Sequence, residues 1–188
     1  YNKNADNFAK TTIDVNFYET QKHFQELLPE HGYILDFGCG SGRDTKYFLE
    51  QGFYVDATDG SEEMCHIASN YTGIQVRRLL FEELDENKKY DGIWACSSIL
   101  HLPKNELKAV FMKMFKALKE DGIIYTSFKY GDFEGERNGR YFTDFTEKTF
   151  EEFVGEIDNL QLKEEWITGD VRPGRGEEKW LNVILQKN

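Results

Sequence analysis

Cysteine, proline and long apolar runs are scarce in this sequence. Cysteine and proline each occur three times in 188 residues, and the cysteines have neither the spacing of a zinc site nor the even number of a disulfide framework. No apolar run reaches the roughly 18 to 20 residues of a membrane-spanning helix, and the first residues lack the apolar segment of a signal peptide. We therefore expect a cytoplasmic protein with no bound metal and no membrane span.

Basic residues are also in the minority. The chain has 23 Lys and Arg against 34 Asp and Glu, which gives a formal net charge of -11. Such a surface repels nucleic-acid phosphates and anionic membranes. The composition therefore favours a small-molecule partner over nucleic acid or a membrane, and it is compatible with a monomer or a homodimer.

Short apolar runs alternate with helical patterns along most of the chain. This alternation is typical of βαβ units, and it predicts an α/β fold with a parallel sheet. The runs lie between turn residues at positions 33–37, 53–58, 74–76, 91–96 and 123–128.

The second half of the chain predicts that the sheet ends in a hairpin with an antiparallel strand. After Pro103 the apolar residues recur at helical spacing, and an Asp-Gly pair at 121–122 is expected to end that helix. A further amphipathic stretch covers residues 146–154. Two strand-like runs, 160–167 and 179–186, are joined by a segment too short for a crossover helix, so they predict a hairpin and an antiparallel last strand.

A glycine-rich turn follows the first apolar run. Residues 34–44 read ILDFGCGSGRD, and a helical pattern begins at Thr45. Glycines let the backbone turn with positive φ and approach a ligand, and amides at a helix N-terminus attract a carboxylate or phosphate. Asp59 follows about 20 residues later, at the end of the second run, where it can accept hydrogen bonds from ribose hydroxyls. The pattern predicts a site for a nucleoside cofactor, and the alternative is a simple tight turn.

The end of the glycine turn indicates which cofactor this is. A dinucleotide motif needs glycine or alanine where Arg43 stands, which disfavours a nicotinamide-dependent oxidoreductase. Asp36 precedes the first glycine by two residues, and the turn closes as Gly-x-Gly-x-Gly. With residues 59–64 (DGSEEM) and 91–96 (DGIWAC), these features resemble the class I S-adenosylmethionine-dependent methyltransferases over nearly the whole chain. The resemblance is closest to compact bacterial enzymes of the tellurite-resistance and small-molecule type.

The resemblance implies a fold and a set of cofactor residues. The fold is a single Rossmann-like three-layer domain, 1–188, with a mostly parallel seven-stranded sheet and an antiparallel last strand. Residues 1–30 would form a helical lid region, 33–128 the cofactor-binding core, and 129–188 the acceptor-side loops, a helix and the terminal hairpin. The cofactor would be S-adenosyl-L-methionine, held by Tyr1, Thr12, Asp36, Gly38, Gly40, Gly42, Arg43, Asp59, Gly60, Ser61, Met64, Leu80, Phe81, Ala95 and Cys96.

Two parts of this assignment have alternatives. Many relatives carry an aspartate after the third strand that accepts from the adenine amino group, but Leu80 stands in that position here. We therefore expect backbone groups of Leu80 and Phe81 to recognise the adenine. Tyr1, Phe8 and Thr12 resemble a segment that covers the cofactor in small-molecule methyltransferases, and they equally fit the packing of an ordinary N-terminal helix.

Arginines gather in the late loops, which should face the same edge of the sheet as the glycine turn. Four of the seven arginines lie there, in an acidic chain. We expect a positive opening that holds a carboxylate or phosphate of the acceptor through bidentate pairing, and the alternative is that these arginines pair with nearby acids. The expected acceptor-binding residues are Lys129, Tyr130, Arg140, Tyr141, Arg172 and Arg175.

His101 is the candidate catalytic residue. It follows the fourth strand, and its ordinary pKa lies near working pH, so it can act as a general base for an oxygen or nitrogen acceptor. A packed histidine, or one that only lines the cavity, is the alternative. The sequence therefore predicts a methyltransferase that acts on a small, anionic molecule. A non-catalytic S-adenosylmethionine-binding module is the second candidate, and the oxidoreductase is the least favoured.

Overall fold

Seven strands form the main sheet of this protein. A computed structural model describes residues 2–188, with the backbone alone for residues 2–4 and 8, so the predicted residue Tyr1 and the side chain of Phe8 lie outside the description. The sheet has the order β3-β2-β1-β4-β5-β9-β8, and its neighbours are parallel except where β9 pairs with β5 and β8. The predicted mostly parallel sheet with an antiparallel last strand is confirmed. The strands are β1 (Tyr33–Phe37), β2 (Tyr54–Asp59), β3 (Arg77–Arg78), β4 (Tyr90–Ala95), β5 (Leu118–Lys129), β8 (Leu160–Gly169) and β9 (Lys179–Lys187).

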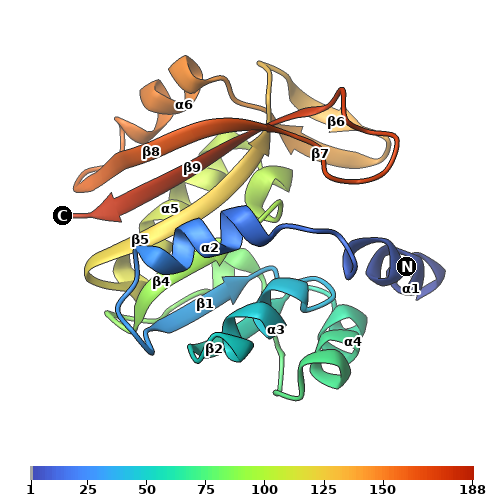
Figure 1. The fold of residues 1–188 in the computed structure, drawn as a ribbon. Helices are drawn as coiled ribbons and strands as arrows, with labels where there is room; N and C mark the ends of the chain where they lie inside the picture. Colours follow the sequence, from blue (N-terminus) through green and yellow to red (C-terminus); the bar gives the residue numbers. More distant parts are fainter. Residues whose placement is uncertain (1) are drawn as a thin grey trace.

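Helices cover both faces of this sheet and make the fold three-layered (Figure 1). On one face, Phe24 of α2 and Phe48 of α3 pack against Trp94. On the other face, Phe111 of α5 and Phe150 of α6 belong to a larger apolar cluster. The helices are α1 (Asn2–Thr12), α2 (Tyr18–Glu26), α3 (Arg43–Glu50), α4 (Glu62–Thr72), α5 (Lys104–Ala117) and α6 (Glu147–Val154), with short 3-10 helices η1 (Phe81–Glu83) and η2 (Ile99–His101).

Residues along the central strands alternate between the two apolar clusters. In β1, Ile34 packs with α2 and α3, whereas Leu35 packs with α5 and α6; in β4, Trp94 and Ile93 divide in the same way. Successive side chains of a strand point to opposite faces. A sheet that is buried on both faces therefore reads as continuous apolar runs, which is why the sequence predicts these strands well.

A small second sheet occupies a segment that the sequence predicts as loop. β6 (Glu134–Arg137) and β7 (Arg140–Thr143) pair antiparallel around Asn138 and Gly139, whose φ values are 51° and 74°. Asn-Gly is a preferred pair for two-residue hairpin turns because both positions need positive φ. The turn signal was therefore present, but the polar flanks lack the apolar alternation that marks a strand.

Two strands, β3 and β5, begin three or more residues away from the predicted position. β3 comprises only Arg77–Arg78 rather than 74–76, because these are the residues that reach the end of β2 and pair with it. β5 begins at Leu118, directly after α5, so the Asp-Gly pair at 121–122 lies inside the strand and does not end the helix. Asp121 has a φ of 61°, which marks an irregularity within the strand.

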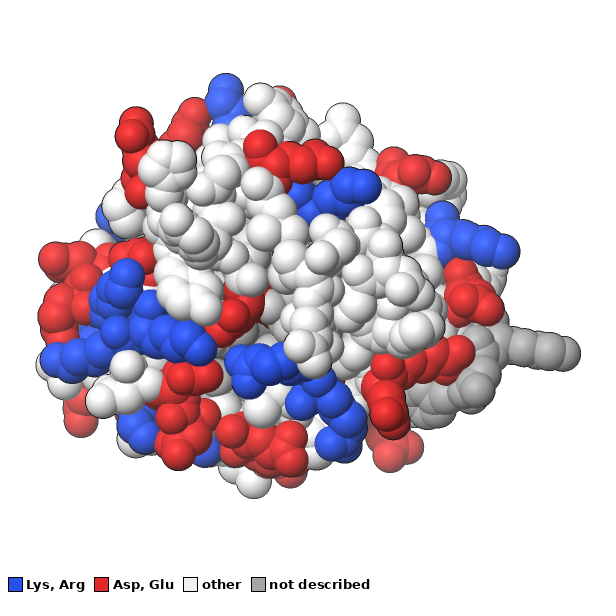
Figure 2. All heavy atoms as spheres, turned by 90° about the horizontal axis from the view of Figure 1, so that it is seen from below, with Lys and Arg blue, Asp and Glu red and all other residues white. Residues whose placement is uncertain are grey.

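Acidic and basic side chains are interspersed on the surface. Figure 2 shows this on the face seen from below, where blue and red groups lie beside one another around a broad area of neither charge. At the β2–β3 edge, for example, Arg77 lies 3.8 Å from Asp56 and 3.7 Å from Glu86. Within residues 2–188, no helix has the length and apolar character needed to cross a membrane.

Candidate functional site

The glycine turn leaves β1 at Phe37 and enters α3 at Arg43. Gly38 and Gly42 have φ values of 85° and 86°, a conformation that other residues rarely adopt. A Cβ on Gly38 would lie 2.5 Å from Cβ of Ser98, and one on Gly42 would lie 2.7 Å from Cγ2 of Thr72. Only glycine fits at either position, so the turn can pass this close to the neighbouring loop and helix.

Asp59 ends β2 directly beside this turn. Its Oδ2 accepts a hydrogen bond from the N–H of Gly40 at 3.0 Å, and its Oδ1 accepts one from the N–H of Ser61 at 2.9 Å. Burial raises the pKa of Asp59, while these two hydrogen bonds lower it. Because a carboxylate oxygen has two lone pairs, each oxygen keeps one position for another donor. This arrangement fits the two hydroxyl groups of a ribose.

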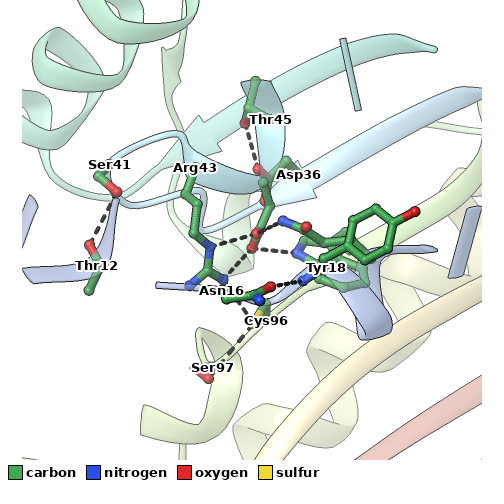
Figure 3. Close-up of polar contacts among 12 residues, drawn as sticks. Thr12, Asn16, Tyr18, Asp36, Ser41, Arg43, Thr45, Cys96 and Ser97 are labelled. Carbon is green, nitrogen blue, oxygen red and sulfur yellow. Dashed lines mark hydrogen bonds and ion pairs between the residues drawn. The ribbon is translucent and has the colours of Figure 1, made fainter. Parts of the chain in front are cut away.

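Asp36 lies beneath the turn, with 2% of its surface exposed. The Oγ1 of Thr45 donates to its Oδ2 at 2.5 Å (Figure 3). Burial, followed by the charge of Asp44, raises the pKa of Asp36 to about 8. Its carboxyl group is therefore mostly protonated at neutral pH. An ammonium group beside it, such as that of a methionine moiety, would favour the charged form.

A second buried carboxylate, Asp44, was not among the predicted site residues. It accepts hydrogen bonds from Arg43 at 2.8 and 2.9 Å, from Nε1 of Trp94 at 2.8 Å and from Nε2 of Gln21 at 2.6 Å. One side chain thus joins α2, α3 and β4 behind the glycine turn. Its place directly after Arg43 was the available signal, but nothing in the sequence indicates that Gln21 and Trp94 lie beside it.

The segment before α2 passes over the same region. The guanidinium group of Arg43 lies 4.9 Å from the centre of the Phe17 ring, a cation–π contact. Oγ1 of Thr12, at the end of α1, lies 3.2 Å from Oγ of Ser41 in the turn (Figure 3). The structure therefore brings the predicted residues Thr12 and Arg43 to the glycine turn.

The residues expected around the adenine lie between β2, α4 and η1. Ser61 caps α4 by accepting a hydrogen bond from the N–H of Met64 at 3.3 Å, and a Cβ on Gly60 would lie 3.2 Å from Cδ2 of Leu80. The N–H of Leu80 already donates to Oε2 of Glu83 at 2.8 Å. Because the Leu80 N–H is bonded to Glu83, it would have to leave this carboxylate before it could donate to adenine.

Phe81, the other residue expected to serve adenine through its backbone, packs against β1. The centres of the Phe81 and Phe37 rings lie 4.9 Å apart in an edge-to-face contact. Phe81 also lies 3.3 Å from the position of a Cβ on Gly38. The Phe81 side chain therefore supports the glycine turn, which gives this residue a packing function in addition to the predicted one.

The end of β4 meets the start of α3. Ala95 is buried, and Sγ of the following Cys96 lies 3.9 Å from Nη2 of Arg43. Burial raises the pKa of Cys96 to about 12. The thiol is therefore neutral at working pH and is not a nucleophile. Cys96 therefore borders the glycine turn through Arg43, and Ala95 directly precedes it in the chain.

His101 ends η2, just beyond β4. Its Nδ1 lies 2.8 Å from the carbonyl oxygen of Tyr141 in β7. Because a carbonyl only accepts, Nδ1 carries the proton and Nε2 holds the lone pair. Burial lowers the pKa of His101 below 6.5, and the charges of Arg140 and Lys129 lower it further. The ring is thus neutral at pH 7 and can accept a proton at Nε2.

Most of the late arginines are paired with acids. Among residues 2–188, Arg140 alone of these four forms no ion pair. The predicted acceptor-binding residues Arg172 and Arg175 are therefore already engaged, as the pairing alternative expects. The observed pairs are Arg137 with Asp144, Arg172 with Asp170 and Arg175 with Glu178.

Of the other predicted acceptor residues, Lys129 and Tyr141 lie near His101. The ring of Phe142 lies 4.6 Å from the His101 ring and 5.8 Å from Nζ of Lys129. The hydroxyl of Tyr130 donates to Glu147 at 2.8 Å, and that of Tyr141 donates to Glu134 at 3.2 Å. The hairpin β6–β7, which the sequence did not predict, therefore assembles this side of the site.

The fold and the site together define a class of protein. A parallel sheet that ends in a reversed strand, with a glycine turn after β1 and an aspartate at the end of β2, is the arrangement of a Rossmann-like nucleoside-binding domain. The donor and acceptor groups fit an adenosine that carries a methionine chain. Asp36 lies at the turn, Asp59 provides two acceptor positions, and Gly60 leaves room beside η1.

Comparison with known proteins shows a likeness to methyltransferases. Residues 34–122 match the family model of a methyltransferase domain. YqeM of Bacillus subtilis, a protein named as a methyltransferase, is 33% identical over 122 residues, which are 59% of this chain and 49% of that protein. These matches support a class I S-adenosylmethionine-dependent methyltransferase, a kind of enzyme whose cofactor is S-adenosyl-L-methionine. The chain spans about half the length of the first curated relatives it matches.

Solved structures agree with this assignment. Burkholderia thailandensis 1,6-didemethyltoxoflavin-N1-methyltransferase, solved with 1,6-didemethyltoxoflavin and S-adenosylhomocysteine, is 25% identical with a TM-score of 0.77, covering 100% of this chain and 84% of that chain. A TehB-like methyltransferase from Corynebacterium glutamicum is 19% identical with a TM-score of 0.72 and full coverage of both chains. The latter likeness shows the fold alone, so the tellurite-resistance type stays a prediction.

Proposed function

We propose that this protein transfers the methyl group of S-adenosyl-L-methionine to a small acceptor that carries a carboxylate or phosphate. The observation that carries the proposal is the neutral His101, with its lone pair on Nε2, at the same sheet edge as the glycine turn and Asp59. The bound cofactor supplies a methyl group that is already activated on a sulfonium. The protein then contributes mainly by positioning the acceptor and accepting its proton.

The proposed cofactor contacts follow the geometry of the turn. The start of α3, Asp36 and Arg43 would hold the methionine end, and Asp59 would accept from both ribose hydroxyls. Gly60 and η1 would border the adenine. Tyr1 remains a predicted contact that lies outside the described residues.

The proposed acceptor side is supported by charge. Arg140 and Lys129 both lower the pKa of His101, which indicates positive charge on this side of the histidine, and Lys129 also forms an ion pair with Glu178. The solved Burkholderia relative is named for methylation of N1 of a small heterocycle, which supports a small acceptor here. Arg172 and Arg175 stay predicted acceptor residues that would first have to leave Asp170 and Glu178.

The test is a turnover assay that detects S-adenosylhomocysteine formation with pairs of small molecules, each as the free acid and as its neutral amide. We expect turnover with at least one acid and at least tenfold less with its amide. His101→Gln should lower kcat by roughly a hundredfold or more without weakening S-adenosylhomocysteine binding. Tight cofactor binding with no turnover of any acceptor would instead favour the non-catalytic binding module, and binding of a nicotinamide dinucleotide alone would favour the oxidoreductase.

A further inference from the structure

A hollow of about 380 Å³ lies where the end of β5, the segment after β7 and the turn between β8 and β9 meet. Six of its seven lining residues carry charge, three of each sign, so its walls have no net charge. The lining residues are Lys129, Tyr130, Arg137, Asp144, Glu177, Glu178 and Lys179.

The charges in this hollow form ion pairs. Lys129 pairs with Glu178, and Arg137 pairs with Asp144. Asp144 is the most buried of the four, with 5% of its side chain exposed, compared with 20% for Lys129 and 36% for Arg137. Its Oδ2 meets Arg137, but its Oδ1 is buried and accepts no hydrogen bond from any residue that the structure describes. A buried carboxylate oxygen of this kind favours a ligand that brings a donor.

The hollow adjoins the proposed catalytic histidine. The ring of Phe142 contacts His101 at a centroid distance of 4.6 Å. The same ring lies 5.0 Å from the guanidinium carbon of Arg137 and 5.8 Å from Nζ of Lys129. The Phe142 side chain therefore lies between His101 and the two basic residues of the hollow.

The pairing pattern discriminates between classes of ligand. An anion that recruited Arg137 would leave Asp144 as a buried charge without a partner, which is strongly unfavourable. A cation that recruited Asp144 would leave Arg137 without its carboxylate. A molecule with both charges can exchange with both partners at once, because its anionic group takes Arg137 and Lys129 while its ammonium group donates to Asp144 and Glu178.

We propose that this hollow binds the methyl acceptor and that the acceptor is a zwitterion, with an ammonium group on the Asp144 and Glu178 side and a carboxylate on the Arg137 and Lys129 side. The proposal rests on the proposed methyl-transfer function, and it narrows the acceptor from an anion to an amino-carboxylate. Recognition then depends on the geometry of two ion pairs rather than on an excess of positive charge.

The experiment compares three flexible probes of similar length: 5-aminopentanoate, pentanoate and pentylamine. Each is titrated at pH 7 and low salt into the 15N-labelled protein, with and without saturating S-adenosylhomocysteine. The indole N–H of Trp180, whose ring lies 5.6 Å from Nζ of Lys129, reports on the hollow, and Trp166 serves as an internal reference. We expect 5-aminopentanoate to bind at least tenfold more tightly than either singly charged probe.

Variants assign this preference to the ion pairs. Asp144→Asn and Lys129→Met should each reduce the preference for 5-aminopentanoate to threefold or less. Because Glu178 is less buried than Asp144, Glu178→Gln gives a second test if Asp144→Asn folds poorly. Asp85→Asn and Lys163→Met, which lie outside the hollow, should retain the preference. Pentanoate binding as tightly as 5-aminopentanoate, or no binding of any probe at Trp180, would overturn the proposal. Failure of S-adenosylhomocysteine to bind would instead overturn the proposed function. The titration without cofactor tests ligand binding in the hollow independently of that result.

Discussion

Two buried carboxyl groups, Asp36 and Asp44, flank the glycine turn in contrasting surroundings. Asp36 accepts one hydroxyl hydrogen bond from Thr45, whereas Asp44 accepts from a guanidinium, an indole and an amide. Donors that include a fixed positive charge stabilise a carboxylate, and burial without them favours the neutral acid. The two residues should therefore respond differently to removal of their charge.

Asp36→Asn should stabilise the cofactor-free protein at high pH. Burial raises the pKa of Asp36 from its ordinary 3.8 to about 8, so its contribution to stability is fully present at low pH and is lost as pH rises through about 8. The melting temperature of Asp36→Asn relative to wild type should thus increase between pH 6 and pH 9. Thermal unfolding across this range measures it, with the exposed Asp85→Asn as the control. A difference that does not change with pH would contradict the protonated state.

His101 should determine the acidic limb of the pH–rate profile. Its pKa lies below 6.5 because of burial and then the charges of Arg140 and Lys129, so protonation should reduce kcat/KM only below pH 6.5. Arg140→Gln removes one of these charges and should move the limb toward higher pH. The measurement is kcat/KM from pH 5 to 8 once an acceptor is in hand. An unchanged limb in Arg140→Gln, or a limb that persists in His101→Gln, would rule out His101 as the base.

At the scale of elements, hydrogen bonds to the Asp44 carboxyl group connect α2 and α3 to β4. Asp44→Asn replaces the carboxyl group that accepts from three buried donors, one of them a guanidinium, and we expect it to lower the free energy of unfolding by about 3 kcal/mol. Gln21→Ala removes a single donor and should cost about 1 kcal/mol. Urea denaturation measures both. Equal losses in the two variants would show that Asp44 does not act as the common acceptor.

The sequence predicts well those elements whose formation depends mainly on one local pattern, such as an apolar run or a glycine turn. β1 and β4 appear as apolar runs because helices cover both of their faces, and α3 follows the glycine turn as the pattern indicates. The hairpin β6–β7 has polar strands, and only its Asn-Gly turn marks it. β3 is short because its pairing with β2, a tertiary contact, sets its bounds. Local patterns thus predict buried elements, and long-range contacts set the others.

Across the whole molecule, the sheet brings distant residues to one edge. Thr12 and Asp59 contact the glycine turn at Ser41 and Gly40. His101 is hydrogen-bonded to the carbonyl of Tyr141, which lies 40 residues later in the sequence. The meeting of Asp59 with the glycine turn was predictable because the motif is contiguous and Asp59 follows at a known interval. The acceptor side was not, because the ion pairs of the hollow join residues such as Lys129 and Glu178, which are far apart in sequence. The arginines in the late loops predicted a positive opening, but most of them form ion pairs with acidic residues.

The central claim, that the glycine turn and Asp59 hold S-adenosylmethionine, is tested most directly by calorimetric titration of S-adenosylhomocysteine into wild type and Asp59→Ala. Asp85→Ala serves as a surface control, and thermal unfolding verifies that each variant is folded. We expect micromolar binding by wild type and by the control, and a loss of roughly thirtyfold or more, about 2 kcal/mol, in Asp59→Ala. No binding by wild type, or equal binding by folded Asp59→Ala, would contradict the account.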